Sequence, residues 1–158
     1  MQRTSVLFVC LGNICRSPLA EGVFRHLVEE RAWSERFEID SAGTGGWHVG
    51  EPPDPRSQAV ARSHGIVLDS RARRLEPEDL DRFEWVLAMD RENLAALRRA
   101  AERIGGGQAR LHLLREFDPE AGSDLEVPDP YYGGNDGFEQ VYAMIRRACE
   151  ELLVEISE

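Results

Sequence analysis

The chain has 158 residues, with 29 acidic and 19 basic side chains and a formal net charge of −10. This length predicts one domain, spanning residues 1–158, with room for a hydrophobic core. The acidic balance excludes nucleic acid as an expected partner, because a polyphosphate backbone requires a basic surface. No apolar run is long enough to cross a membrane, and residues 6–11 are too few for a signal-peptide core. We therefore expect a cytoplasmic protein with no membrane association.

The chain has three cysteines, and this odd number argues against a disulfide scaffold. There is no Cys-x-x-Cys pair and no Cys/His cluster, so we expect no structural zinc. Cys149 lies on the apolar face of a predicted helix and is expected to be inert core. Cys10 and Cys15 lie close together near the N-terminus, and their context is more informative.

Residues 6–9, Val-Leu-Phe-Val, form a short apolar run that predicts a buried strand. Ser17 and Pro18 predict the start of a helix, with Ser17 as the N-cap and Pro18 at the first helical position. Between the strand and the helix a loop runs from Cys10 to Arg16. A strand, a tight loop and a helix N-terminus bring backbone N–H groups to one point. This arrangement predicts an anion site directly after the first strand.

Cys10 begins this loop and Arg16 ends it. Converging N–H groups and a nearby guanidinium stabilise a thiolate, which makes a cysteine nucleophilic at neutral pH. The planar guanidinium of Arg16 can hold two phosphate oxygens at once. A bare Cys-to-Arg spacing is more often a buried cysteine beside a surface arginine. The preceding strand, the Gly12–Asn13 turn and the helix start instead favour phosphoryl transfer through a cysteinyl-phosphate.

Residues 9–18, Val-Cys-Leu-Gly-Asn-Ile-Cys-Arg-Ser-Pro, resemble the signature loop of the low-molecular-weight protein tyrosine phosphatases. Most signature positions are matched, and the resemblance spans nearly the whole chain. It implies hydrolysis of phosphotyrosine in proteins, with phosphate or other oxyanions as inhibitors. No metal or other cofactor is expected, because Arg16 and the loop amides supply the charge stabilisation. The residues that the resemblance places in the phosphate-binding loop are Leu11, Gly12, Asn13, Ile14, Cys15 and Ser17.

The remaining chain alternates between predicted helices and strands. Helices are predicted over residues 18 to about 31, 55 to about 64, 91 to about 104 and 136 to about 156, and strands over 37–40, 85–89 and 110–114. Residues 66–68 are predicted to be a short extended piece. This order predicts an α/β domain with a four-stranded central parallel sheet and helices on both faces. Ligands of such sheets bind at the carboxyl ends of the strands, where Cys10 lies.

Ser41 follows the second predicted strand, next to the end of the first. Its spacing is equally consistent with an ordinary turn serine. The resemblance implies a hydrogen bond between Ser41 and Asn13, a residue type that tolerates a left-handed backbone. Trp47 lies in a glycine-rich loop, where a tryptophan more often covers core, but the resemblance makes it a candidate for stacking on the substrate ring. We expect the neighbouring His48 to be a solvated loop residue.

Asp129 stands between two prolines, which make its backbone stiff and extended. A lone Asp-Pro is usually a turn, but the reaction requires a general acid, and no histidine lies in a recognisable catalytic context. Residues 129–132, Asp-Pro-Tyr-Tyr, resemble the general-acid loop of the family. The resemblance implies that Asp129 protonates the leaving phenolate and then activates water. Tyr131 and Tyr132 are expected to wall the substrate cleft.

Two other charged features are predicted to be structural. Asp90 follows the third predicted strand and is expected to cap the next helix. The basic residues within 71–74 precede acidic residues within 76–81, which predicts a surface of paired charges.

Three alternative functions remain open. A thiol arsenate reductase shares this fold and loop but needs further redox cysteines, and Cys149 on a helix face is a poor substitute. A protein-arginine phosphatase is closer, but its members tend to have a smaller threonine where this chain has Ile14, so Ile14 favours phosphotyrosine. A phosphate-binding module without turnover is disfavoured by the joint presence of Cys10, Arg16 and Asp129.

Overall fold

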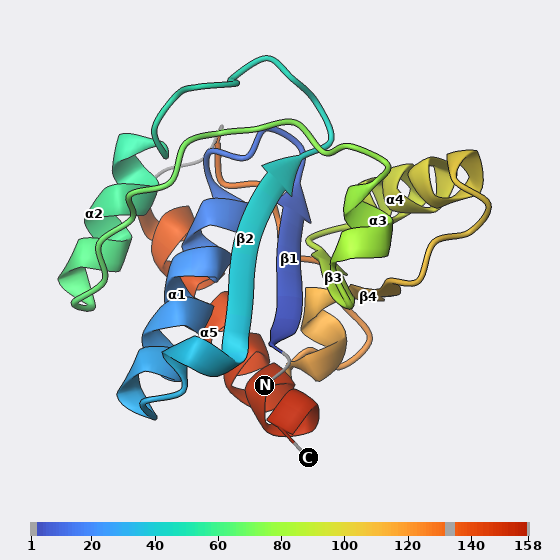
Figure 1. Ribbon diagram of the computed structural model, residues 1–158. Coiled ribbons are helices and arrows are strands. Elements are labelled where there is room, and N and C mark those ends of the chain that lie inside the picture. The colour runs from blue at the N-terminus through green and yellow to red at the C-terminus, as the bar shows by residue number, and fades with distance from the viewer. Residues whose placement is uncertain (1–2, 132–134, 158) are drawn as a thin grey trace.

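A single parallel sheet forms the centre of the molecule in the computed structural model, which describes residues 3–131 and 135–157 (Figure 1). The strand order is β2-β1-β3-β4. The strands are β1 (Thr4–Cys10), β2 (Phe37–Gly43), β3 (Trp85–Ala88) and β4 (Arg110–Leu113). Every neighbouring pair is parallel, which confirms the predicted four-stranded sheet. The apolar strand β1 lies between β2 and β3, so the residue that ends it, Cys10, lies in the interior of the sheet.

Helices cover both faces of this sheet, as predicted. They are α1 (Arg16–Glu30), α2 (Pro55–Ser63), α3 (Asp79–Arg82), α4 (Arg91–Arg103) and α5 (Asn135–Ser157), with 3-10 helices at Ser34–Arg36 and Leu114–Phe117. Successive β1 side chains point to opposite faces. Val6 and Phe8 belong to the core cluster that includes α1 and α5, whereas Leu7 and Val9 belong to the one that includes α4.

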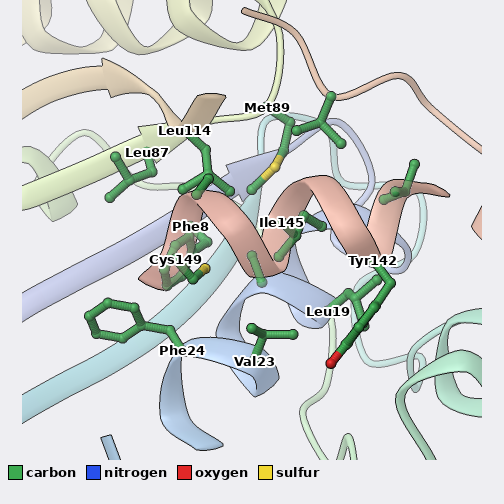
Figure 2. Close-up of a cluster of buried hydrophobic side chains, with 14 of the residues drawn as sticks. Phe8, Leu19, Val23, Phe24, Leu87, Met89, Leu114, Tyr142, Ile145 and Cys149 are labelled. Atoms are coloured by element: carbon green, nitrogen blue, oxygen red, sulfur yellow. The ribbon is translucent and has the colours of Figure 1, made fainter. Parts of the chain in front are cut away.

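The larger core cluster is built around aromatic side chains from different elements. Phe24 of α1 lies with its ring centroid 5.7 Å from that of Phe8 on β1 and 5.6 Å from that of Phe37 on β2. Figure 2 shows Cys149 of α5 among these apolar side chains. Burial raises the pKa of the Cys149 thiol well above its ordinary value. Cys149 is therefore core, as the sequence predicts.

We expect Phe24→Ala to lower the free energy of unfolding by about 3–5 kcal/mol, since it removes a fully buried ring and leaves a cavity between α1 and the sheet. Urea denaturation measures this change. The control, Val154→Ala, truncates an exposed apolar side chain on α5 and is expected to cost no more than about 0.5 kcal/mol. Equal losses in the two variants would contradict the central place of Phe24 in the core.

One local prediction differs from the structure. Ser17 is not the N-cap of α1, because the helix already begins at Arg16 and the N-cap position falls on Cys15, which makes no side-chain cap bond. The Ser17 hydroxyl bonds other side chains of the loop instead. Ile66 and Leu68 join no strand, but they pack closely enough that a Cβ on Gly22 of α1 would meet both.

The carboxyl ends of the strands meet at one edge of the sheet, and the β1–β2 register places Cys10 beside Gly43. The loops that follow these strands therefore lie next to each other. Of the helices described here, none combines the length and apolar character that a membrane span requires.

Candidate active site

The loop after β1 is held by backbone hydrogen bonds from the chain that follows β2. The amides of Thr44 and Gly45 donate to the carbonyls of Cys10 and Leu11, each at 2.9 Å. A Cβ at Gly43 would lie 2.9 Å from the Leu11 carbonyl oxygen, so this close approach requires glycine. These hydrogen bonds satisfy the two carbonyl groups within the protein. Neither carbonyl therefore needs a donor from the space that an anion would occupy.

The sulfur of Cys10 lies among hydrogen-bond donors at the bottom of this loop. Cys10 is 2% exposed, and its Sγ lies 3.0 Å from Ser17 Oγ and 3.4 Å from the Ser17 amide nitrogen. The Ser17 amide donates to the sulfur, and the hydroxyl can do so as well. These contacts place two polar groups of Ser17 at the sulfur, and they explain why the Ser17 side chain is not available as a helix cap.

Asn13 shapes the loop from its centre. Its φ of 58° places it in the left-handed region, which few residues other than glycine adopt. Its Nδ2 donates to Ser17 Oγ at 2.7 Å and to Ser41 Oγ at 3.0 Å, so the expected bond between Asn13 and Ser41 is present. Its Oδ1 accepts from the backbone N–H of Arg73 at 3.0 Å. Three bonds therefore hold the strained backbone in place.

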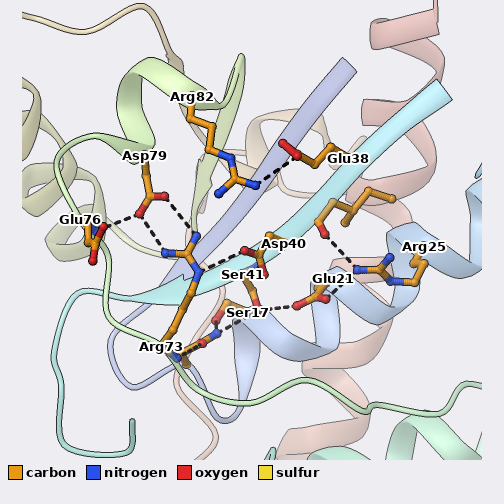
Figure 3. A network of polar contacts seen from close by, with 12 residues as sticks. Ser17, Glu21, Arg25, Glu38, Asp40, Ser41, Arg73, Glu76, Asp79 and Arg82 are labelled. Atoms are coloured by element: carbon orange, nitrogen blue, oxygen red, sulfur yellow. Dashed lines mark hydrogen bonds and ion pairs between the residues drawn. The ribbon is translucent and has the colours of Figure 1, made fainter. Parts of the chain in front are cut away.

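Glu21 of α1 extends this network, as Figure 3 shows. It accepts a hydrogen bond from the Ser41 hydroxyl and another from Arg25 at 2.8 Å. Burial raises the pKa of Glu21, although the bonds from Ser41 and Arg25 act in the opposite direction. This role of Glu21 was not predicted from the sequence. Only the helical spacing of Glu21 from Ser17, one turn further along α1, hinted that the two share a face.

Arg16 is almost fully buried beside the loop. Its Nη1 donates to Asp90 Oδ2 at 2.7 Å and to the Val127 carbonyl at 3.0 Å. Burial opposes the charge, but Cys10 and Asp90 outweigh it and raise the pKa of Arg16. Asp90 also accepts from the Asn93 amide at 2.8 Å, so the predicted cap of α4 is confirmed. Its second role, orienting Arg16, was missed, although its position at the end of β3 pointed to the same edge of the sheet.

Asp129 lies on the other side of Arg16, in the segment before α5. Its Oδ2 is 3.6 Å from Arg16 Nη2, and its Oδ1 accepts from the Tyr131 amide at 3.0 Å. The Val127 amide donates to the Met89 carbonyl at 2.7 Å, which fixes the segment to the end of β3. The carboxyl group is 39% exposed and so remains accessible from the solvent side of the loop.

These groups line one cavity of about 320 Å³. Its lining residues are Cys10, Leu11, Gly12, Ile14, Cys15, Arg16, Trp47, His48, Asp129 and Tyr131. Of the three predicted aromatic walls, Trp47 and Tyr131 line the cavity, and Tyr132 lies outside the described residues. Trp47 is 71% exposed, and its ring occupies the space that a Cβ on Gly45 would need.

His48, expected to be a solvated loop residue, lies in a loop with its side chain 29% exposed, and it also lines this cavity, which was not predicted. The ring lies against Gly12, where an added Cβ would come within 3.0 Å of it, and its centroid is 6.3 Å from that of Tyr131. Its Nδ1 lies 2.9 Å from Glu51 Oε2. The glycines around it gave no periodic pattern from which the orientation of this loop could be predicted.

The two cysteines of the loop differ in their electrostatic surroundings. Burial and the nearby Asp54 carboxylate raise the pKa of Cys15 to about 12. Cys15 is therefore a neutral thiol at pH 7 and a weak nucleophile. Cys10, by contrast, has both the hydroxyl and the amide of Ser17 within reach of its sulfur.

The parallel sheet with helices on both faces, together with an anion loop that places a cysteine beside a buried arginine, defines an α/β protein with a phosphatase-like site at the carboxyl edge of its sheet. The model of the family described as low molecular weight phosphotyrosine protein phosphatase matches residues 5–158. The chain belongs to this family.

Relatives of the chain are found among curated proteins and solved structures. A low molecular weight protein-tyrosine-phosphatase of Streptomyces coelicolor is 51% identical over 97% of this chain and 93% of its own length. The crystal structure of a protein tyrosine phosphatase from Entamoeba histolytica has a TM-score of 0.90 and 36% identity, covering 98% of this chain and 97% of the other. A Drosophila arginine phosphatase has a TM-score of 0.91 and 34% identity, with coverage of 97% and 98%.

Proposed function

We propose that this protein hydrolyses phosphotyrosine in proteins through a cysteinyl-phosphate, with Cys10 as nucleophile, Arg16 as phosphate clamp and Asp129 as general acid and base. The observation that carries this proposal is the convergence of the three side chains on one cavity, where Arg16 Nη2 lies 3.6 Å from Asp129 Oδ2. The family of the chain supports the same class of reaction, since the Streptomyces relative is named a protein-tyrosine-phosphatase.

The contacts of Arg16 support its role as the clamp. Within residues 3–131 and 135–157, its hydrogen bonds to protein groups come from Nη1 alone. Nη2 makes only the longer ion pair to Asp129, and Nε makes no bond to a described residue. These two N–H groups lie on one edge of the guanidinium, so they suit two oxygens of one phosphoryl group. Asp90 fixes the opposite edge and thereby sets the plane of the fork.

In the first proposed step the Cys10 thiolate attacks phosphorus, and the bond from phosphorus to the phenolic oxygen breaks. Protonated Asp129 donates its proton to that oxygen, so the product leaves as a neutral phenol. In the second step Asp129, now a carboxylate, accepts a proton from water as the water attacks phosphorus. The sulfur–phosphorus bond breaks, which releases inorganic phosphate and restores the thiolate. Arg16 and the loop amides stabilise the charge on the phosphoryl oxygens in both steps.

The rim of the cavity supports an aromatic substrate. Trp47 and Tyr131 line the same cavity as Cys10 and Arg16, and aromatic side chains there can stack on an aromatic ring that carries the phosphate. We propose the same role for Tyr132. The expected partners are tyrosine-phosphorylated proteins, with phosphate and other oxyanions as inhibitors. A cytoplasmic location is consistent with three free thiols.

The second candidate substrate is phosphoarginine, because the Drosophila relative in the structural comparison is named an arginine phosphatase. Ile14 argues for phosphotyrosine. Its side chain lines the cavity with branched apolar bulk and offers no acceptor to a guanidinium group. A smaller, hydroxyl-bearing side chain at this position favours the other substrate.

We expect the wild type, without added metal, to hydrolyse a phosphotyrosine peptide at least about tenfold faster, in kcat/KM, than a phosphoarginine peptide of otherwise identical sequence. Ile14→Thr is expected to shift this ratio toward phosphoarginine by roughly tenfold, because it removes bulk and adds a hydrogen-bonding group. Release of inorganic phosphate measures both rates. Val49→Thr, an exposed residue outside the cavity lining, is the matched control and should leave the ratio unchanged.

A wild type that prefers phosphoarginine would overturn the substrate assignment while preserving the mechanism. A wild type that binds phosphate but turns over neither peptide would instead indicate a binding module. An arsenate reductase would show thiol-dependent reduction of arsenate, which Cys149, buried in the core, is poorly placed to support.

A further inference from the structure

A segment that follows α2 in the chain crosses the carboxyl end of β2 and lies behind the loop from Cys10 to Arg16, called the phosphate loop below. This crossing segment, residues 72–75, runs across the tip of β2 in Figure 1. The Gly43 amide donates to the Arg73 carbonyl at 2.9 Å, and the Leu75 amide donates to the Gly43 carbonyl at 2.7 Å. A single bridge, between Gly43 and Arg74, is all that pairs it with the described part of the sheet.

The crossing segment also contacts the loop directly. The backbone N–H of Arg73 donates to Asn13 Oδ1 at 3.0 Å, and Asn13 is 3% exposed. The other two hydrogen bonds of the Asn13 side chain go to α1 and β2, so this third bond joins Asn13 to a separate part of the fold. Without it a buried carbonyl oxygen loses its donor, and the left-handed backbone of Asn13 loses one of its three restraints.

The side chain of Arg73 fixes this segment through two carboxylates, as Figure 3 shows. Nη1 and Nη2 bind the two oxygens of Asp79 at 3.0 and 3.2 Å, and Nε binds Asp40 Oδ2 at 3.1 Å. Asp79 is 6% exposed and begins α3, and Asp40 lies on β2. The guanidinium therefore ties the crossing segment to a helix and a strand at once, in the bidentate geometry that only arginine provides.

We propose that Arg73 is a positioning residue for phosphoryl transfer: its guanidinium fixes the crossing segment so that its own backbone N–H holds Asn13, and with it the phosphate loop, in the reactive shape. This inference rests on the proposed function. It also explains why Arg73 is bound by two carboxylates at the back of the loop, where it cannot touch substrate. The predicted surface of paired charges thus includes one pair that acts on the site.

Positioning has a kinetic signature that stability alone lacks. A loop that relaxes slightly still surrounds a tetrahedral phosphate, but it fits the five-coordinate transition state less well. The losses should therefore be larger in kcat and in the affinity for orthovanadate, which adopts five-coordinate geometry, than in KM and in the affinity for inorganic phosphate. Small misplacements of this kind change rates strongly.

The test compares three variants of the full chain with the wild type. Arg73→Gln combined with Asp79→Asn removes the ion pair without leaving a buried carboxylate uncompensated. Arg73→Lys keeps the charge and loses the fork. Arg82→Gln is the matched control, because Arg82 also links α3 to β2, through Glu38 at 3.2 Å, but does not contact the crossing segment. Each is assayed with para-nitrophenyl phosphate, with inhibition by phosphate and orthovanadate, and by thermal denaturation.

We expect the double variant to lose about tenfold in kcat with a change in KM below about threefold, and to lose orthovanadate affinity about tenfold more than phosphate affinity. Arg73→Lys should recover part of both losses, and Arg82→Gln should match the wild type. A double variant that melts earlier but keeps wild-type kcat and a wild-type ratio of the two inhibition constants would overturn the inference. If the wild type itself binds phosphate without turnover, the proposed function fails, and the ratio of oxyanion affinities still decides the role of Arg73.

Discussion

Cys10→Ser is expected to lower hydrolysis of para-nitrophenyl phosphate by at least about 10⁴-fold, because removal of a catalytic nucleophile leaves only binding and electrostatic stabilisation. The hydroxyl that replaces the thiol has no base within the loop to ionise it. Ser17, which contacts the sulfur, donates its backbone N–H to it. The phosphate-binding groups remain in place, so we expect inorganic phosphate to bind the variant within about tenfold of its wild-type affinity, as calorimetry would measure.

The matched control for this variant is Cys149→Ala, which removes a thiol from the core rather than from the cavity. It should lose some thermal stability and keep wild-type kcat. A second readout identifies the intermediate itself: rapid acid quenching during turnover should leave one phosphoryl group on the peptide that contains Cys10. Turnover that survives in Cys10→Ser, or a phosphoryl group on another peptide, would mean that the nucleophile is a different residue.

Asp129→Asn should reduce kcat/KM for phenyl phosphate by roughly 10²–10⁴-fold, the usual contribution of a positioned general acid. Asparagine keeps the acceptor for the Tyr131 amide, so the segment should stay in place. It cannot donate a proton to the departing oxygen as an acid. Continuous detection of phenol release measures the loss, at a temperature low enough that both enzymes are fully folded.

The leaving group makes this prediction specific. Para-nitrophenolate is a much weaker base than phenolate and needs less protonation, so its phosphate ester should lose less in Asp129→Asn. The ratio kcat/KM is the appropriate quantity, because it reports the steps up to cleavage of the phosphorus–oxygen bond. Asp124→Asn, an exposed carboxylate earlier in the same connection, is the control and should leave both rates unchanged. Equal losses for the two esters would exclude Asp129 as the acid.

The charge of the site is local in a chain whose net charge is −10. Arg16 is buried, with its guanidinium nitrogens 2.7 Å from Asp90 and 3.6 Å from Asp129, so Asp90 already compensates part of its charge. In the proposed reaction a phosphate dianion is therefore expected to be stabilised mainly by the loop amides together with Nε and Nη2 of the guanidinium. Correct loop geometry is consequently more important here than long-range attraction.

Much of the site could be predicted because it is encoded in consecutive residues. The loop from Cys10 to Arg16 places the proposed nucleophile and the proposed anion cradle within seven positions, and their arrangement depends mainly on the adjoining strand and helix. The alternation of apolar runs and amphipathic segments likewise indicated a parallel sheet with helices on both faces. Both inferences use short-range energetics, which the sequence expresses directly.

Sequence patterns were less reliable wherever one side chain had two possible uses. Ser17 matched a helix cap, but its hydroxyl contacts Asn13 and Cys10, and the helix starts at Arg16, two residues before the predicted start at Pro18. His48 is a partly exposed loop residue, as predicted, but its place in the cavity lining depends on how the glycine-rich loop folds. For Ser17 a local preference was outweighed by partners that the tertiary structure provides.

The sequence by itself determined the class of fold, and it predicted the loop with the proposed nucleophile and arginine and the candidate acid. Only the tertiary structure decided which residues hold them: Asp90 on Arg16, Glu21 on Ser41 and Arg73 on Asn13. The partners in these pairs lie 74, 20 and 60 residues apart in the chain. They meet because the strand order β2-β1-β3-β4 brings separate carboxyl ends to one edge, and the free energy of such contacts depends on the assembled sheet rather than on neighbouring residues.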